Sequence, residues 1–176
     1  MDPSDALIVA AEISFGLVGM AGIIASLRGV DIRKGEAVGL TILVYTAFGS
    51  GFGALIPMLF LFMELTTAEV WSISSAINAS VGAAGFALAL FGIKGTKYFR
   101  ENRLSMIIFS ITIIACIVIN ASNATGYFFE PSFAPIFGTG LAVLGISAYL
   151  FAVMLLVPVW RVILERKVGT AHEENT

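Results

Sequence analysis

Long apolar runs separated by short polar segments dominate this chain. Five such runs cover most of its 176 residues: 6–27, 37–63, 70–93, 104–121 and 136–160. A helix needs about 20 apolar residues to cross the ~30 Å hydrocarbon core of a bilayer. The pattern therefore predicts an all-α integral membrane bundle of five transmembrane helices. Segments of about ten residues with alternating polarity, typical of a transmembrane β-barrel, do not occur in the sequence.

Composition supports this fold class. Hydrophobic residues make up 58% of the chain, charged residues 12%, and the mean hydropathy is +0.95. A soluble domain carries about a quarter charged residues. The runs and their loops predict one transmembrane domain, 1–165, followed by a short cytoplasmic tail, 166–176. The flank MDPSD has no basic residue and no cleavage site closes the first run, so we expect a retained helix rather than a signal peptide.

Charge predicts the orientation of the bundle. All ten Lys and Arg residues lie in three segments, 28–34, 94–103 and 161–167. The charged residues of the N-terminus and of the second and fourth loops are all acidic. Because cytoplasmic loops collect Lys and Arg, we expect the N-terminus outside and the C-terminus in the cytoplasm. A single orientation makes any homo-oligomer parallel. Five spans also cannot divide into two equal inverted halves, which disfavours a complete secondary transporter.

The inventory of reactive side chains argues against an enzyme. Cys116 is the one cysteine and His172 the one histidine, so an intrachain disulfide, a cysteine metal cluster, bis-histidine haem ligation and a Ser/His/Asp triad within the membrane are excluded. The stretch GSGFG, 49–53, lies inside an apolar run and not after a strand, unlike a phosphate loop. We expect no cofactor, no metal and no nucleic-acid partner, since the basic loops are short and fit topology better.

The second run is irregular. Gly49, Gly51 and Gly53 precede Pro57, whose ring would clash with the carbonyl of Gly53 four residues back. We therefore expect a kink near Gly53, either static or serving as a hinge that lines a cavity.

Small residues recur on two of the predicted helices, where they would allow close helix packing in lipid. These residues are Gly16, Gly19 and Gly22 in the first helix and Gly82 and Gly85 in the third. Both packing within the bundle and packing between subunits agree with the pattern.

Glu12 is the unusual residue of the first span. It lies roughly 9 Å inside the outer end of its helix and shares a face with Gly16 and Gly19, which predicts a carboxyl directed toward packed protein. At similar depth the third helix offers Asn78, with Ser74 and Ser75 on the same polar face, and we predict a hydrogen bond from Glu12 to Asn78, with Ser75 as a further partner.

The charge of Glu12 needs an explanation because no Lys or Arg lies on this side. Its carboxyl should be protonated, exposed to water or facing a cation. Intramembrane acids often mark ion paths. The alternative is a neutral side chain that joins two helices.

Three functions fit these features. The first is a parallel homo-oligomeric cation channel with Glu12 in an outer vestibule. The second is a non-catalytic accessory subunit that docks a membrane-protein partner through its small-residue faces. The third is a module that binds a lipid or small molecule between the kink at Gly53 and the polar face of the third helix.

The stretch AEISFGLVGMAGIIASLRG, 11–29, resembles the opening of a scattered group of small bacterial membrane proteins. In that group an acidic residue precedes a Gly-rich first helix and a short basic loop. The resemblance implies a bacterial inner (plasma) membrane location and no assigned activity.

Overall fold

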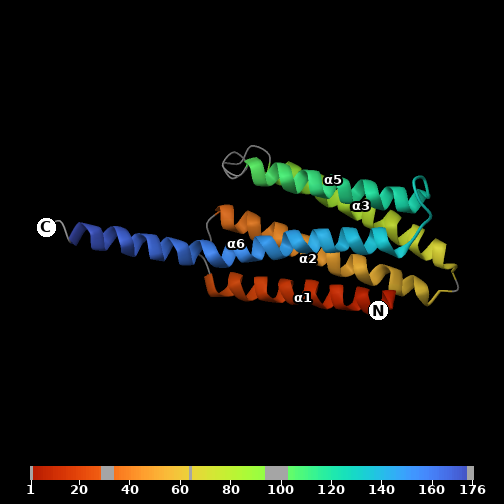
Figure 1. The fold of residues 1–176 in the computed structure, drawn as a ribbon, viewed down its shortest axis with the longest axis horizontal. Coiled ribbons are helices and arrows are strands. Elements are labelled where there is room, and N and C mark those ends of the chain that lie inside the picture. The colour runs from red at the N-terminus through yellow and green to blue at the C-terminus, as the bar shows by residue number, and fades with distance from the viewer. Residues whose placement is uncertain (1, 29–33, 64, 94–102, 174–176) are drawn as a thin grey trace.

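The computed structural model describes residues 2–28, 34–63, 65–93 and 103–173. In this part of the chain the fold is all-α, with five long helices (Figure 1). They are α1 Pro3–Arg28, α2 Lys34–Leu61, α3 Thr67–Ile93, α5 Arg103–Thr125 and α6 Phe133–Glu173. Each is long and apolar enough to cross a membrane. The predicted bundle of five membrane-spanning helices is confirmed.

The helices form three layers (Figure 1). α2 and α6 lie in the middle, α1 packs on one side of them, and the pair of α3 and α5 packs on the other. Successive helices run in opposite directions, so the start of α1 and the α2–α3 and α5–α6 connections lie at the same end.

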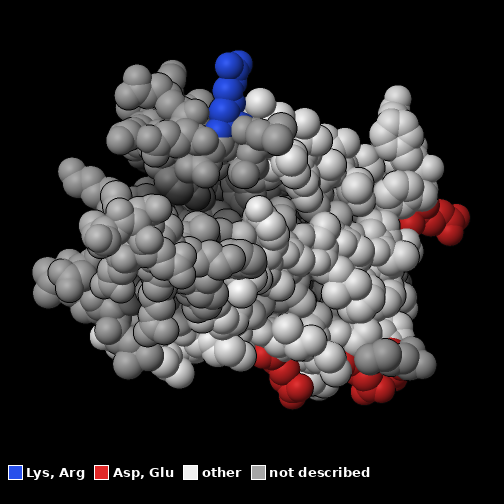
Figure 2. Space-filling view, turned by 60° about the vertical axis from the view of Figure 1, so that its left-hand side comes forward, with Lys and Arg blue, Asp and Glu red and all other residues white. Residues whose placement is uncertain are grey.

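Charged side chains separate along the bundle. The end where α1 begins, here called the acidic end, carries Asp2, Asp5, Glu69 and Glu130. Arg103 begins α5 at the opposite end, here called the basic end. Figure 2 shows the described basic and acidic side chains on separate parts of the surface. That the acidic end faces outward stays a prediction from the loop charges.

Local signals fix the ends of the helices. At α3, Glu69 Oε2 accepts hydrogen bonds from the N–H (2.9 Å) and hydroxyl (2.8 Å) of Thr66, and the Glu69 N–H donates to Thr66 Oγ1. This is a capping box, which satisfies backbone donors at a helix start. At the end of α5, Gly126 has φ +66° and the N–H of Tyr127 donates to the carbonyl of Ser122, as in a Schellman motif.

The core at the acidic end joins four helices. It consists of Leu7, Ala10, Ala11, Ala54, Val70, Trp71 and Ile136. Farther along α1, Ser14 and Ala21 are fully buried, and a Cβ built on Gly51 of α2 would lie 3.2 Å from Ser14 Cβ and 3.1 Å from Phe15 Cζ. Gly51 therefore allows α1 and α2 to approach closely, and its predicted role in a kink or hinge stays a prediction.

α6 is much longer than the predicted span. Its 41 residues correspond to a helix of about 60 Å, twice the thickness of the hydrocarbon core. The helix continues past residue 160 and projects from the basic end of the bundle (Figure 1). Most of the predicted tail is thus helical up to Glu173, and residues 174–176 lie outside the described part.

Candidate functional site

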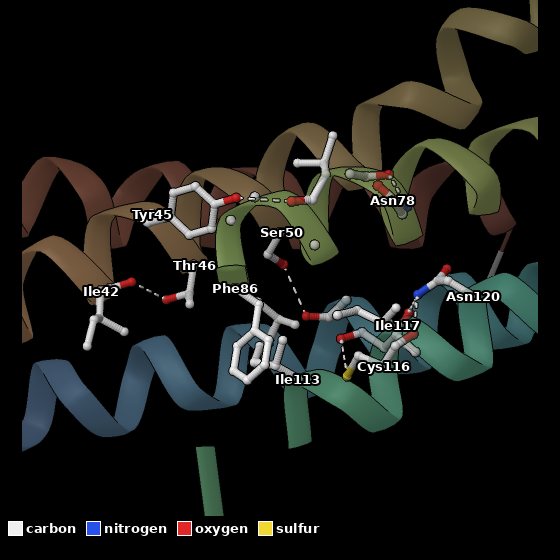
Figure 3. A pocket seen from close by; sticks show the side chains of 18 of the residues that line it. Ile42, Tyr45, Thr46, Ser50, Asn78, Phe86, Ile113, Cys116, Ile117 and Asn120 are labelled. Atoms are coloured by element: carbon white, nitrogen blue, oxygen red, sulfur yellow. Dashed lines mark hydrogen bonds between the residues drawn. The ribbon is translucent and has the colours of Figure 1, made fainter. Parts of the chain in front are cut away.

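A cavity of about 500 Å³ lies between α2, α3, α5 and α6, with α1 contributing Leu7 and Ala10 at one end (Figure 3). This volume is in the range of small-molecule sites. None of the described lining residues is charged, and most are apolar, including Val38, Ile42, Phe86, Phe109, Ile113 and Val143. The described wall is therefore mainly apolar, with a smaller number of polar side chains.

The cavity is elongated along the bundle. On α2 its lining extends from Ala37 to Ala54, about 25 Å at the rise of an α-helix. Tyr45, Val81 and Leu88 line it and are also exposed on the outside of the bundle. The cavity therefore reaches the surface between α2 and α3, where a membrane would present lipid.

Several polar side chains of the wall are bonded across helices (Figure 3). The Tyr45 hydroxyl donates to the carbonyl of Val81 (3.2 Å), and Ser50 Oγ donates to the carbonyl of Gly140 (3.1 Å). Thr46 Oγ1 lies 2.7 Å from Ser147 Oγ in a buried hydrogen bond between α2 and α6. These hydrogen bonds link the helices that form the wall. Each of these hydroxyl groups already donates its hydrogen to a protein acceptor.

Asn78 has a specific backbone partner. Pro57 has no N–H, so the carbonyl of Gly53 lacks its normal helical donor. Asn78 Nδ2 donates to this carbonyl from α3 at 3.3 Å. A Cβ on Gly53 would lie 2.8 Å from Asn78 Oδ1, so a glycine is needed for this approach. Neighbouring helices commonly satisfy backbone groups freed by a membrane proline in this way. α2 is continuous through Pro57, and a hinge at Gly49 or Gly53 stays a prediction.

Asn120 leaves one acceptor unused. Its Nδ2 donates to the carbonyl of Cys116 (3.0 Å) and to Thr139 Oγ1 (2.8 Å). Both partners are acceptors there, because the Thr139 hydroxyl donates to the carbonyl of Pro135 or Ile136. The amide orientation is therefore fixed by its neighbours. Asn120 lines the cavity, is only 5% exposed, and its Oδ1 has no hydrogen-bond partner among the described residues. Buried acceptors of this kind are rare.

Glu12 lies elsewhere, and its predicted hydrogen bond to Asn78 is wrong. Its side chain is exposed on the surface of α1 and forms no hydrogen bond within the described residues. The expected further partner, Ser75, instead accepts a hydrogen bond from Asn123 Nδ2 (2.6 Å). The reason is that α1 packs through its Ala and Ser face, which includes Ala11 and Ser14, and turns its Gly face outward.

The other predicted residues divide between packing and exposure. A Cβ on Gly85 would overlap the Tyr45 ring, and one on Gly82 would contact Ile117, so these glycines pack within the bundle. Gly16, Gly19 and Gly22 have open space beside them, as does Gly49, which lines the cavity. Ser74 and Ser75 are fully buried; Ser74 Oγ has no partner among the described residues, and neither serine is found in the cavity wall described.

Asn120 and Thr139 are not among the residues predicted from the sequence. The sequence does contain a signal that could have indicated them, because each is a polar residue in an apolar run. Such residues face protein or a cavity more often than lipid. Within the described ranges, no group of three or more His, Cys, Asp and Glu side chains could hold a metal ion.

No protein-family model, curated protein or solved structure matches this chain. The resemblance of residues 11–29 to small bacterial membrane proteins, and the membrane it implies, stay expectations.

Proposed function

We propose that this chain is an intramembrane binding module that takes up an apolar molecule from the surrounding bilayer. The observation that carries the proposal is the uncharged cavity of about 500 Å³ between α2, α3, α5 and α6. Apolar walls favour an apolar ligand, because a ligand that fills such a space supplies the packing contacts that a void forfeits.

The surroundings of the cavity support loading from the membrane. Its wall reaches the outside of the bundle at Tyr45, Val81 and Leu88, on the face between α2 and α3. A hydrophobic molecule dissolved in lipid would reach this opening without crossing water.

Blocking the cavity should abolish binding. Gly140 lines the cavity and has open space at its Cβ position, so Gly140→Leu places a side chain into it without a backbone clash. A long-chain alkanol carrying a diazirine, photolysed in vesicles that contain the protein, should label cavity residues of α5 such as Ile113 and Ile117. We expect excess unlabelled alkanol to suppress this labelling and Gly140→Leu to reduce it by at least fivefold.

Gly138→Leu is the matched control. Gly138 lies on the same helix, is exposed and also has open space at its Cβ position, but it does not belong to the cavity wall described. Its labelling should equal that of the unmodified protein. Labelling confined to the outward side chains Ile111 and Ile114, with no saturation by alkanol, would disprove the binding function.

A second proposal is the parallel homo-oligomer, with cation conduction as its function. It is supported by the exposed face of α1, on which Glu12 lies beside Gly16 and Gly19 and no other described atom lies within 4 Å of a Cβ built on either glycine. Parallel copies that meet through this face would bring several Glu12 carboxyls to the same depth, and rings of acids favour cations. Docking of a different membrane protein on the same face is the accessory-subunit alternative.

Self-association can be tested by placing a bulky side chain on the exposed glycine face of α1. Gly19→Leu should convert the oligomer to monomer in native mass spectrometry from mild detergent, because close helix approach in membranes depends on small residues. Glu12→Gln should keep the oligomer and weaken its preference for cations in planar bilayers. Gly145→Leu, at an exposed glycine of α6 with open space, serves as the control. A monomeric unmodified protein, or copurification with another membrane protein at fixed ratio, would contradict the homo-oligomer.

A further inference from the structure

We infer that the side chain of Tyr45 is a gate between the cavity and the surrounding lipid, and that its opening sets the rate at which a ligand exchanges. This inference rests on the binding function proposed above and adds the residue that controls entry.

The first step concerns the position of Tyr45. It belongs to the cavity wall, and it is 43% exposed. Its ring extends from α2 toward α3, where the hydroxyl meets the carbonyl of Val81 (Figure 3). Val81 is itself exposed and lines the cavity. The ring therefore lies across the gap between the two helices, at the place where the wall reaches the outside of the bundle.

The second step concerns the other side of this gap. Next to Val81, α3 contributes Gly82 and Gly85 to the wall, and neither has a side chain to fill the space. Gly85 is buried, and a Cβ built on it would overlap the hydroxyl end of the Tyr45 ring. The ring thus rests directly on the backbone of α3. Moving it away would uncover the two glycines and leave an opening toward the lipid.

The third step concerns what holds the ring in place. The Tyr45 hydroxyl donates one hydrogen bond (3.2 Å) to the carbonyl of Val81. This carbonyl lies inside α3, where helical geometry also pairs it with the N–H of Gly85. Opening the gate therefore leaves no backbone group of α3 unpaired. The closed position depends on one neutral hydrogen bond and on the contact of the ring with Gly85, and single substitutions can remove each of them.

A gate has a distinct kinetic signature. It changes the rates of entry and release by the same factor and keeps the bound fraction constant, whereas a residue that holds the ligand changes the bound fraction. Both quantities can be measured with a long-chain alkanol that ends in a trifluoromethyl group, added to mixed micelles that contain the protein. Fluorine exchange NMR spectroscopy gives the rate of exchange between bound and micellar alkanol, and the integrated signals give the bound fraction.

Tyr45→Phe should raise the exchange rate about threefold to fivefold, the factor expected for one neutral hydrogen bond between membrane helices. Tyr45→Ala should raise it by about tenfold or more, because the contacts of the ring with α3 are lost as well. Gly85→Ala should also raise the rate, since its methyl group displaces the ring, and it should add nothing in the Tyr45→Ala background. In every variant the bound fraction should stay within about twofold of that of the unmodified protein.

Tyr149→Ala is the matched control, because Tyr149 is an exposed tyrosine of α6 outside the described wall. Its exchange rate should equal that of the unmodified protein. Should Tyr45→Ala not fold, the rate in Tyr45→Phe decides alone. Unchanged exchange in the Tyr45 variants would overturn the gate and leave the cavity function standing, as would a smaller bound fraction without faster exchange. Absence of a bound signal in the unmodified protein would overturn the cavity function itself.

Discussion

Asn78→Ala should lower the free energy of unfolding by about 1–3 kcal/mol, because it leaves the Gly53 carbonyl without a donor inside the bundle. Pro57 is fully buried and cannot supply the missing N–H. The cost should be visible in denaturant titrations in mixed detergent micelles. Hydrogen bonds between membrane helices contribute about 0.6–2 kcal/mol to stability. We therefore expect the destabilisation by Asn78→Ala in the lower part of the range of about 1–3 kcal/mol.

A double-mutant cycle isolates the cause. Pro57→Ala restores an N–H at residue 57 that can donate to the Gly53 carbonyl, so Asn78→Ala should cost about 1 kcal/mol less in that background. The cavity left by removing the proline ring cancels in the cycle, because it is present in both variants that carry Pro57→Ala. Thr112→Ala, which removes only a bond within its own helix, should change stability by less than about 0.5 kcal/mol. Additive costs for Asn78→Ala and Pro57→Ala would contradict this account of the Gly53 carbonyl.

The relation of Pro57 to Asn78 shows what the sequence can predict. Residue counting along a helix predicts depth, and Asn78 of α3 does reach the carbonyl of Gly53, one turn before Pro57. Residue counting does not predict which side chain donates to the Gly53 carbonyl, because this depends on the rotation of α3 about its axis. Five apolar runs determine how many helices cross the membrane, because lipid requires length and hydropathy from each of them. Rotation depends on contacts between side chains of different helices, which no single run contains.

Glu12 illustrates the same limit. α1 has small residues on two faces, Ala11 and Ser14 on one and Gly16 and Gly19 on the other. Both faces allow close packing, so size alone cannot decide which of them meets α2 and α6. The structure packs the Ala and Ser face, where Gly51 of α2 accommodates Ser14 and Phe15. Glu12 is left on the outside as a consequence of that choice.

The free acceptor of Asn120 could not be predicted because it depends on several surrounding groups at once. The carbonyl of Cys116 belongs to the same helix and follows from helical geometry. Thr139 belongs to α6, and its hydroxyl is an acceptor toward Asn120 only because it donates within its own helix. An asparagine in an apolar run predicts a polar contact, but the unpaired oxygen follows only from the arrangement of α5 against α6 around the cavity.

Asn123→Ala should lower the free energy of unfolding by about 2–4 kcal/mol. This cost is larger than the one expected for Asn78→Ala. Asn123 is fully buried, and three of its hydrogen bonds leave its own helix. Its Oδ1 accepts from the N–H of Ser132 (2.9 Å), and its Nδ2 donates to the carbonyl of Ser132 (3.1 Å) and to Ser75 Oγ (2.6 Å). One side chain thus joins α3, α5 and the connection to α6. Removing it takes away the acceptor of the Ser132 N–H and one donor to the Ser132 carbonyl.

The neighbouring Ser122→Ala is the control, because the Ser122 hydroxyl bonds only to the carbonyl of Val118 in its own helix. Its cost should stay below about 0.5 kcal/mol. Asn123→Ala should also speed proteolysis between residues 126 and 132, since these bonds hold the connection against the bundle and local opening controls cleavage. Equal stability of the two variants would mean that the α5–α6 connection is held by packing, such as that of Phe133 on Trp71 (ring centroids 5.6 Å apart), rather than by Asn123. In that case apolar contacts of the connection would position Ile136, which follows it and lines the cavity.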